Sequence, residues 1–440
     1  MNIKKNKKVL ILNLNEANFD FILKYAKKYN NKNILEFLKN KKKIKTITKD
    51  LTQHKNLDPW VQEVSINTGR DSKKHKVFNL GDILSKNIPQ IWDIISKKYK
   101  VLVWGSMNSQ LRDNNNIKLF FPDPWNFTSK IKPKKLINFF LLPNYYAKNY
   151  TQPSLFKILH YSLKTLSVIL TNIYFYKNLF KNFFFYITLI FSITSKLNYK
   201  LFVLFDILSL LTILKYEKKN LPAVSFIFLN SIAHFQHNNW NEKNNYKFFF
   251  QLLDILFCEI NTLHQRYGIS LTYNGFTQKR IKTEYLLRPL SPEKFLKNIN
   301  VKYHKLEQNM TNGGIIFFDN SIKCLKNFHI MKNYKICGYN LFILDKINDK
   351  SFFYKIGIKS LSKNLNPKNI KDKIKNYKKN YNKYKFNLDN YDLFEKMKFI
   401  KTTGVHVNHG LLLTHNLKKI KKNIIYNHKI FYILKNILNV

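Results

Sequence analysis

The sequence predicts an α/β protein with a mainly parallel central sheet flanked by helices. Short apolar runs of strand length are each followed at once by polar residues, and stretches of helix length separate these runs. Four such runs are Val9–Leu14, Val101–Trp104, Val224–Leu229 and Ile269–Thr272. Ligands of open α/β sheets bind at the carboxyl ends of the strands. The polar residues after the four runs are therefore expected to form one functional rim.

The first run is expected to be a buried strand, followed by a polar turn at Asn15–Asn18 and an amphipathic helix over Phe19–Tyr29. Asn13 interrupts the apolar stretch, which is shorter than the 7–15 apolar residues or so of a signal peptide. The three cysteines are far apart in the sequence, which is typical of a reducing compartment. We therefore expect a cytoplasmic protein, or one peripheral to the inner face of the membrane.

Helices are also expected over Ile91–Lys97, before the second run, and over Phe248–Tyr267, between the third and fourth. The segment at about 150–219 is rich in Leu, Ile, Phe and Tyr. Its longest uncharged stretch, 182–195, has 14 residues, fewer than the 20 or so that a spanning helix needs. We expect an inserted helical hairpin packed on the core. The alternative is a peripheral membrane contact, since lysines flank the aromatic residues.

The expected organisation has five parts. They are the first half of the α/β core at 1–140, a helical insertion at 141–219, the second half of the core at 220–290, a smaller α/β lobe at 291–400 and a return to the core at 401–440. In the lobe we expect strands at Gly314–Phe318, Tyr339–Leu344 and Phe352–Ile358. A Lys/Asn/Tyr-rich stretch, Asn364–Asn390, is expected to be solvated helix or loop.

The charge of the chain is strongly basic, with 76 Lys+Arg against 26 Asp+Glu and a formal net charge of +50. Only five of the basic residues are arginines. Lys, Asn, Ile and Phe all have codons rich in A and T, so most of the charge is explained by a base-composition bias. Few arginines argue against a specific nucleic-acid partner, because arginine matches phosphate and base acceptors best. The lysines would still attract an anionic small molecule, glycan or lipid.

Three motifs carry candidate chemistry. The first is Asp58-Pro59-Trp60, which opens a helix expected to end at Gly69. The free N–H groups of such a helix start form a natural anion site, although an ordinary capped helix has the same pattern. The other two motifs are pairs of histidines three residues apart, a spacing that metal sites use and that ordinary hydrogen bonding also explains. These pairs are His234 with His237, after the third run, and His406 with His409, near the carboxyl end.

The order of these motifs resembles the alkaline-phosphatase-like superfamily, in its type I phosphodiesterase/nucleotide pyrophosphatase and sulfatase-like branch. The resemblance covers about 8–108, 222–290 and 402–416. The residues that carry it are the turn after the first strand, the Pro-Trp helix ending in Thr68-Gly69 with His75 behind it, His237, Gly275-Phe276 and Gly404-x-His406. It implies a hydrolytic site at the strand ends, with two divalent metals and a Thr, Ser or modified Cys nucleophile.

The sequence departs from that pattern at most of the site positions. The first-strand aspartate of the family falls on Asn15, and the nucleophile falls on Asp58 or Pro59, neither of which has a hydroxyl group. Ala233 and Tyr273-Asn274 replace further ligands. Only His237 and His406 remain of six usual ligands, so a conventional two-metal centre is not expected.

Two accounts of the site remain open. In the first, the chain is an atypical hydrolase or transferase acting on a phosphate or sulfate ester of a surface glycan or lipid. Its catalytic residues are Glu16, Asp58, His237 and His406. The two histidines hold one divalent metal, zinc or manganese, or the site has none, and Asp58 acts as general base or nucleophile.

In the second account the chain is an inactive relative that binds an anionic glycan or lipid. The candidate substrate-binding residues of both accounts are Asn15, Trp60, Gln62, Asn230 and Asn274. A third possibility is a scaffold at the membrane surface that uses the aromatic helices of 150–219.

Overall fold

The computed structural model of the chain describes residues 8–51, 57–112, 114–126, 130–150, 153–191, 198–308, 312–336, 339–357, 397–417, 420 and 422–440. The chain forms two compact units. The first unit comprises Met1–Arg280 and Gly404–Val440, and the second comprises Ile281–Thr403. All the candidate site residues belong to the first unit.

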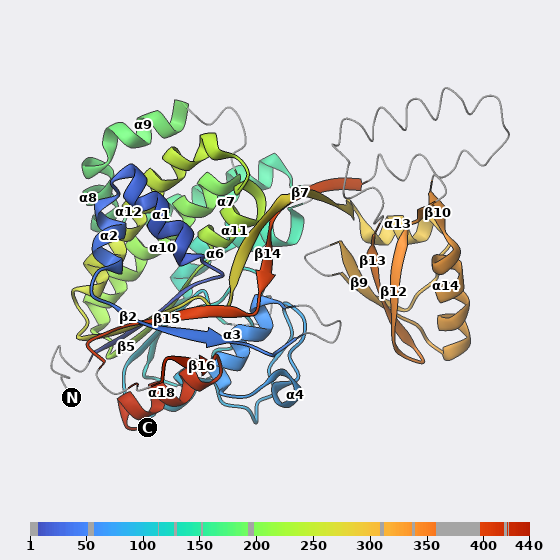
Figure 1. The fold of residues 1–440 in the computed structure, drawn as a ribbon, viewed down its shortest axis with the longest axis horizontal. Helices are drawn as coiled ribbons and strands as arrows, with labels where there is room; N and C mark the ends of the chain where they lie inside the picture. The colour runs from blue at the N-terminus through green and yellow to red at the C-terminus, as the bar shows by residue number, and fades with distance from the viewer. Residues whose placement is uncertain are drawn as a thin grey trace. The chain divides into compact units, whose positions relative to one another are not determined.

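The first unit is built around an eight-stranded sheet of order β16-β2-β15-β6-β1-β5-β3-β4 (Figure 1). The strands are β1 (Val9–Leu14), β2 (Lys42–Ile47), β3 (Val101–Trp104), β4 (Ile117–Phe121), β5 (Val224–Leu229), β6 (Ile269–Tyr273), β15 (His409–His415) and β16 (Ile424–Tyr426). Only β15 runs antiparallel to its two neighbours. The other neighbouring pairs are parallel, which confirms the predicted mainly parallel sheet.

Helices cover both faces of this sheet. Leu10 and Leu12 of β1 belong to one apolar cluster, whereas Val9 and Ile11 belong to another. This alternation follows from the two-residue period of a strand. Both sides are apolar because both are covered. The first cluster contains α1 (Phe19–Tyr29), α10 (Asn198–Asn220) and α12 (Tyr246–His264), and the second contains α5 (Ile91–Ile95) and α18 (Lys429–Leu438).

The segment predicted as a helical hairpin is helical and packs on the core, as expected, but it contains more than two helices. The described part of this region forms a series of helices, α6 (Ile137–Asn149), α7 (Leu155–Ile169), α8 (Ile173–Lys181) and α9 (Phe183–Phe191), followed by α10. Asn172 separates α7 from α8, because its side chain accepts a hydrogen bond from the backbone N–H of Tyr174 and so caps α8. Among the described residues, no helix has the length and apolar character needed to cross a bilayer.

The second unit contains a four-stranded antiparallel sheet of order β12-β13-β9-β8. Its elements are β8 (Lys305–Gln308), β9 (Gly313–Phe317), β12 (Phe342–Asn348) and β13 (Ser351–Ile356), with helices α13 (Pro292–Asn298) and α14 (Ser321–Asn333). The strand expected over Tyr339–Leu344 is interrupted at Leu341, since β11 (Tyr339–Asn340) ends there and β12 follows. The expected solvated stretch 364–390 lies outside the described residues.

Two long strands, β7 (Thr277–Pro289) and β14 (Met397–Val407), pair with each other. Each strand has residues in both units. The ends of β7 and β14 that belong to the first unit carry Gln278 and His406. These two side chains both reach the candidate site.

Candidate active site

Glu16 lies at the carboxyl end of β1 in a left-handed backbone conformation, with φ at 54°. This conformation is uncommon outside glycine and persists only where the surroundings hold it. The N–H of Glu16 donates to the carbonyl of Asn274 at 3.1 Å. Its carbonyl accepts a hydrogen bond from the Gln236 side chain at 3.0 Å. The backbone of Glu16 is thus fixed by two other segments.

Gln236 belongs to α11 (Ser231–Asn239), which follows β5. The start of α11 is fixed by Asp206 of α10, whose buried carboxylate accepts hydrogen bonds from the backbone N–H groups of Asn230 and Ser231 at 3.1 and 2.9 Å. Further along the same helix, His237 reaches Glu16. The region predicted as an insertion therefore orients a helix of the site.

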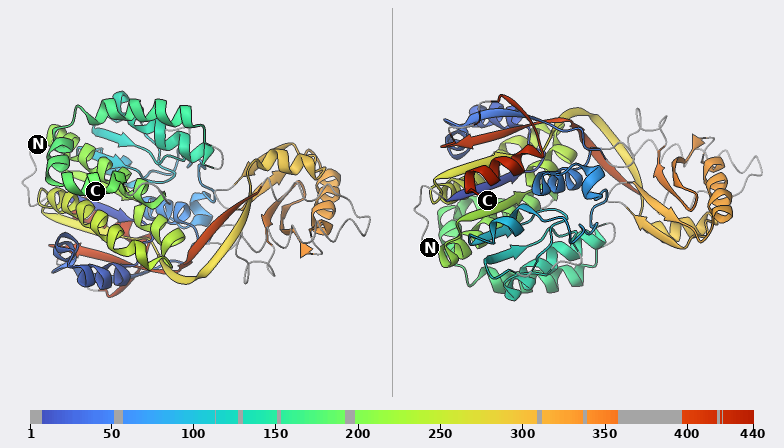
Figure 2. Two further views of the ribbon diagram at one scale, coloured as in Figure 1. Left: turned by 90° about the horizontal axis from the view of Figure 1, so that it is seen from above. Right: turned by 90° about the horizontal axis from the view of Figure 1, so that it is seen from below.

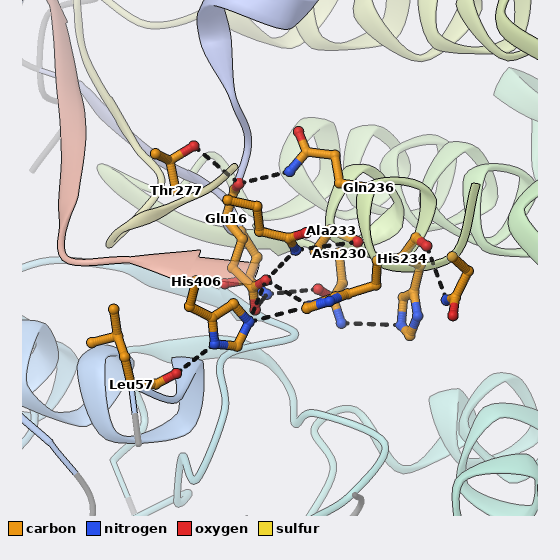
Figure 3. Close-up of polar contacts among 12 residues, drawn as sticks. Glu16, Leu57, Asn230, Ala233, His234, Gln236, Thr277 and His406 are labelled. Atoms are coloured by element: carbon orange, nitrogen blue, oxygen red, sulfur yellow. Dashed lines mark hydrogen bonds and ion pairs between the residues drawn. The ribbon is translucent and has the colours of Figure 1, made fainter. Parts of the chain in front are cut away.

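The side chains of Glu16, His237 and His406 converge. Figure 3 shows Glu16 and His406 pointing toward each other. The Glu16 Oε2 atom lies 2.9 Å from His237 Nε2 and 3.0 Å from His406 Nε2. The two Nε2 atoms are 3.2 Å apart. The Gln278 amide also donates a hydrogen bond to Glu16 Oε2. The site thus joins β1, α11, β14 and β7.

His406 is oriented by its second ring nitrogen. Its Nδ1 atom hydrogen-bonds the backbone carbonyl of Leu57. A carbonyl only accepts, so Nδ1 carries the proton of that bond and Nε2 faces Glu16 and His237. Metal-binding histidines are held in the same way, with the second nitrogen donating to a carbonyl or carboxylate.

The electrostatics of the site favour the charged forms of Glu16 and His406. Burial alone would raise the pKa of Glu16, but the charges of His406 and His237 and hydrogen bonds from both lower it well below its usual value. Burial alone would lower the pKa of His406, but Glu16 raises it to about 9, with contributions from Asp58 and the Leu57 carbonyl. Glu16 is therefore ionised at neutral pH, and a metal binding here would displace a proton from His406.

The three donor atoms also fit a small divalent cation. Ligands of a tetrahedral zinc ion lie about 2.0–2.1 Å from the metal, which puts them about 3.3 Å from one another. The three separations of 2.9, 3.0 and 3.2 Å are close to that spacing. One carboxylate and two imidazoles are also a donor set that zinc sites use.

Asn15 and Asn230 lie beside this triad. The Asn15 amide donates to Asn230 Oδ1 at 2.7 Å and to Glu16 Oε1 at 3.3 Å. Asn15 thus orients the second carboxylate oxygen of Glu16, which leaves Oε2 facing the histidines. The neutral amide of Asn15 thus bonds to the carboxylate of the next residue.

Asp58 precedes α3 (Pro59–Thr68), at the helix N-cap. Its carboxylate makes no capping hydrogen bond to the helix. It is partly exposed, and its charge contributes to the raised pKa of His406. Asp58 is therefore a carboxylate close to the triad and accessible from solvent.

The other three predicted binding residues bond within the protein. Trp60 Nε1 donates to the Phe78 carbonyl at 2.9 Å, and the Gln62 amide donates to the Asp50 carbonyl at 2.7 Å. The Asn274 amide donates to the Ala17 carbonyl at 2.7 Å, and its oxygen accepts from the Leu411 N–H at 2.9 Å. All three are buried. The polar side-chain groups of Trp60, Gln62 and Asn274 therefore bond to the scaffold around the site.

Each histidine pair contributes one residue to the triad. His234 stacks on Phe202 instead, with ring centroids 3.6 Å apart. His409 begins β15 and is exposed. The spacing of three residues therefore does not reflect two ligands from one loop. The amides of Gln236 and Gln278 were not predicted, since their only sequence signal is proximity to His237 and to Gly275-Phe276.

His75, which follows the Pro-Trp helix, is buried and holds that helix in place. Its Nδ1 accepts from the backbone N–H of Val77 at 3.1 Å, and its Nε2 lies 3.0 Å from Ser65 Oγ of α3. Burial lowers the pKa of His75 to about 4, against smaller opposing effects of Asp50 and Asp71. His75 is thus neutral in the folded protein.

This burial predicts an acid-sensitive fold. Between pH 6.5 and 4 the unfolded chain binds a proton at His75 that the folded chain does not, so stability falls as the pH falls through this range. We expect a loss of roughly 3 kcal/mol from this residue by pH 4. Unfolding in urea at pH 7 and pH 4.5 measures it. His75→Gln should reduce the difference between the two pH values, and an unchanged difference would contradict the assignment.

No known family profile matches the sequence, and no curated protein matches it. Solved structures that resemble the chain include murine ectonucleotide pyrophosphatase/phosphodiesterase 5, with 9% identity and a TM-score of 0.45 over 98% of this chain and 95% of that one. Another is the alkaline phosphatase PafA, with 12% identity and a TM-score of 0.45 over 100% and 97%. A third is phosphonoacetate hydrolase from Sinorhizobium meliloti, with 9% identity and a TM-score of 0.42 over 99% and 96%.

At such identities and TM-scores, the function of this chain has to be inferred from its own residues.

Proposed function

We propose that the chain is a metal-dependent hydrolase or transferase acting on a phosphate or sulfate ester. One divalent cation, zinc or manganese, is held by Glu16, His237 and His406. The observation that supports this most directly is the triangle of three donor atoms, separated by 2.9, 3.0 and 3.2 Å. It is an atypical site, since a single carboxylate and two histidines replace the usual six ligands.

The roles of the other residues follow from their contacts. When bound, the cation supplies charge that stabilises the transferred group and activates the attacking oxygen. Asp58 accepts a proton from the attacking water or alcohol as general base, or attacks the ester itself as nucleophile. Gln278 and Asn15 orient the two oxygens of Glu16 by their hydrogen bonds. The surplus of lysines raises the local concentration of an anionic glycan or lipid substrate.

A second candidate function is binding without catalysis. It is favoured by the raised pKa of His406, about 9, which gives the metal-free site a cationic imidazole beside a carboxylate. Positions 58 and 59 also lack a hydroxyl nucleophile. Such a site would bind an anionic glycan or lipid. For either function we propose a cytoplasmic protein, in keeping with Cys258 and Cys324, which form no disulfide within the described residues.

Metal content and turnover decide between the two functions. The full chain is loaded with zinc or manganese, dialysed and analysed for metal, then tested on bis(p-nitrophenyl) phosphate and an aryl sulfate. We expect one equivalent of metal and metal-dependent turnover. His406→Ala should lose both, whereas the matched control His409→Ala, three residues away and exposed, should keep both. A protein that binds neither metal and turns over neither ester would contradict the proposed hydrolase.

A further inference from the structure

Helix α7 has an apolar face that points to solvent. Its large exposed side chains follow one another at intervals of three and four residues after the first pair, so they form a single stripe along the helix and its C-cap. This stripe, exposed by 41–82%, consists of Leu155, Phe156, Leu159, Leu163, Leu166 and Leu170. Scattered exposed leucines are normal, but a continuous apolar surface marks an interaction site.

The rotation of α7 about its axis is fixed by a part of its surface outside the stripe. Thr165 and Ile169 are buried there, and the Thr165 hydroxyl donates to the Asn138 carbonyl of α6 at 3.3 Å. The stripe therefore cannot turn inward without breaking the packing between α6 and α7. In Figure 2 the green-cyan helices of this segment form an outer layer of the first unit.

The next two helices, α8 and α9, also expose large apolar side chains. Ile173 and Phe180 of α8 are 61% and 77% exposed, and Phe183 and Phe184 of α9 are 48% and 83% exposed. Such residues would normally be covered by the protein's own core. Each of these helices thus leaves large apolar side chains in solvent.

The charged side chains of the same segment are all positive. Between Asp123 and Asp206 the sequence has 82 residues without a single Asp or Glu, but with 11 lysines. The chain as a whole carries 26 acidic residues in 440. Lys157 and Lys164 lie on α7 outside the stripe, and Lys177 and Lys181 lie on α8. An apolar face accompanied only by positive charge matches a surface that is itself apolar and anionic.

We propose that α7, α8 and α9 bind the surface of an anionic lipid bilayer, with the leucine stripe of α7 inserted among the acyl chains and the lysines at the headgroups. None of the described helices is long and apolar enough to span a bilayer, so the contact is peripheral. A second copy of the chain is a poorer partner, because it would bring lysines against lysines. This inference does not depend on the hydrolytic activity proposed above.

Sedimentation with vesicles tests the proposal. The full chain is mixed with vesicles of phosphatidylcholine alone and of phosphatidylcholine with 30% phosphatidylglycerol. We expect binding to the anionic vesicles that weakens as salt is added, because salt screens the lysines. The double variant Leu159→Glu/Leu163→Glu should bind more than about tenfold more weakly, since two leucines that insert into the bilayer are lost and two negative charges are gained.

The controls separate this surface from general stickiness. Leu159 and Leu163 are 62% and 60% exposed, so their replacement should leave the unfolding transition unchanged. Ile322→Glu, at a position 79% exposed on α14 of the second unit, should leave vesicle binding unchanged. The proposal is overturned by absence of binding to anionic vesicles, by equal binding of the double variant, or by a dimer in solution that the double variant abolishes.

Discussion

Glu16→Gln is expected to weaken the binding of zinc or manganese by more than about 100-fold and to remove metal-dependent turnover. Residues that only orient a metal ligand already contribute about 10–100-fold to affinity, and Glu16 is the one carboxylate of the triad. Glutamine keeps the size of the side chain and the hydrogen bonds of the Glu16 backbone to Asn274 and Gln236. The loss should therefore reflect the carboxylate charge. Calorimetric metal titration measures it.

The metal-free protein offers an independent measure of the same substitution. Glu16 is the main reason that the pKa of His406 rises to about 9, so Glu16→Gln should lower that pKa, as followed by NMR of the imidazole protons. Glu36→Gln, at an exposed glutamate of α2 (Lys32–Leu38), is the matched control and should change neither quantity. Unchanged metal affinity in Glu16→Gln would exclude the triad as a metal site.

Asp58→Asn is expected to lower kcat by about 10²–10⁴-fold, the usual contribution of a general acid or base, with metal content unchanged. Asp58 makes no capping hydrogen bond to α3, so asparagine at this position should not unfold the helix. Its carboxylate affects His406 without belonging to the triad. A variant with full turnover would remove Asp58 from the mechanism.

A matched aspartate provides the control for Asp58. Asp71 also precedes a helix, α4 (Ser72–His75), but its side chain accepts a hydrogen bond from the N–H of Lys74 and acts as a cap. Asp71→Asn should leave kcat unchanged.

If Asp58 acts as nucleophile, its carboxylate oxygen forms a bond to phosphorus as the alcohol leaves. A phosphorylated Asp58 would then be found by mass spectrometry after rapid quenching.

Four strands of the central sheet, β1, β3, β5 and β6, were predicted from the sequence because they are buried on both faces. The other four, β2, β4, β15 and β16, were not predicted. An uninterrupted run such as Val9–Leu14, all of it buried, has few alternatives to a central parallel strand. The helical region was harder, since nearly uniform apolar composition conceals where one helix ends and the next begins. The boundary between α7 and α8, for example, depends on a single cap, Asn172.

Some residues of the candidate site were predicted from the sequence, and others were missed or given a role they do not have in the structure. The structure brings together Glu16, His237 and His406, which the sequence analysis had named as candidates. Polar residues at strand ends serve either a ligand or the scaffold, and the sequence does not distinguish these roles. Asn274 bonds to the backbone of Ala17 and Leu411, whereas Asn15 bonds to Glu16. Gln278 was missed because an amide on a strand follows no informative pattern.

The triad joins residues that are far apart along the chain. Glu16 and His237 are separated by 221 positions, and His237 and His406 by 169. During synthesis, a ribosome-bound chain therefore has no complete site until His406 has emerged. A cation bound only by the finished triad would stabilise the folded chain over every shorter intermediate, in proportion to the logarithm of its concentration. Metal supply in the cell would then set how much of the newly made protein survives as well as how fast it works.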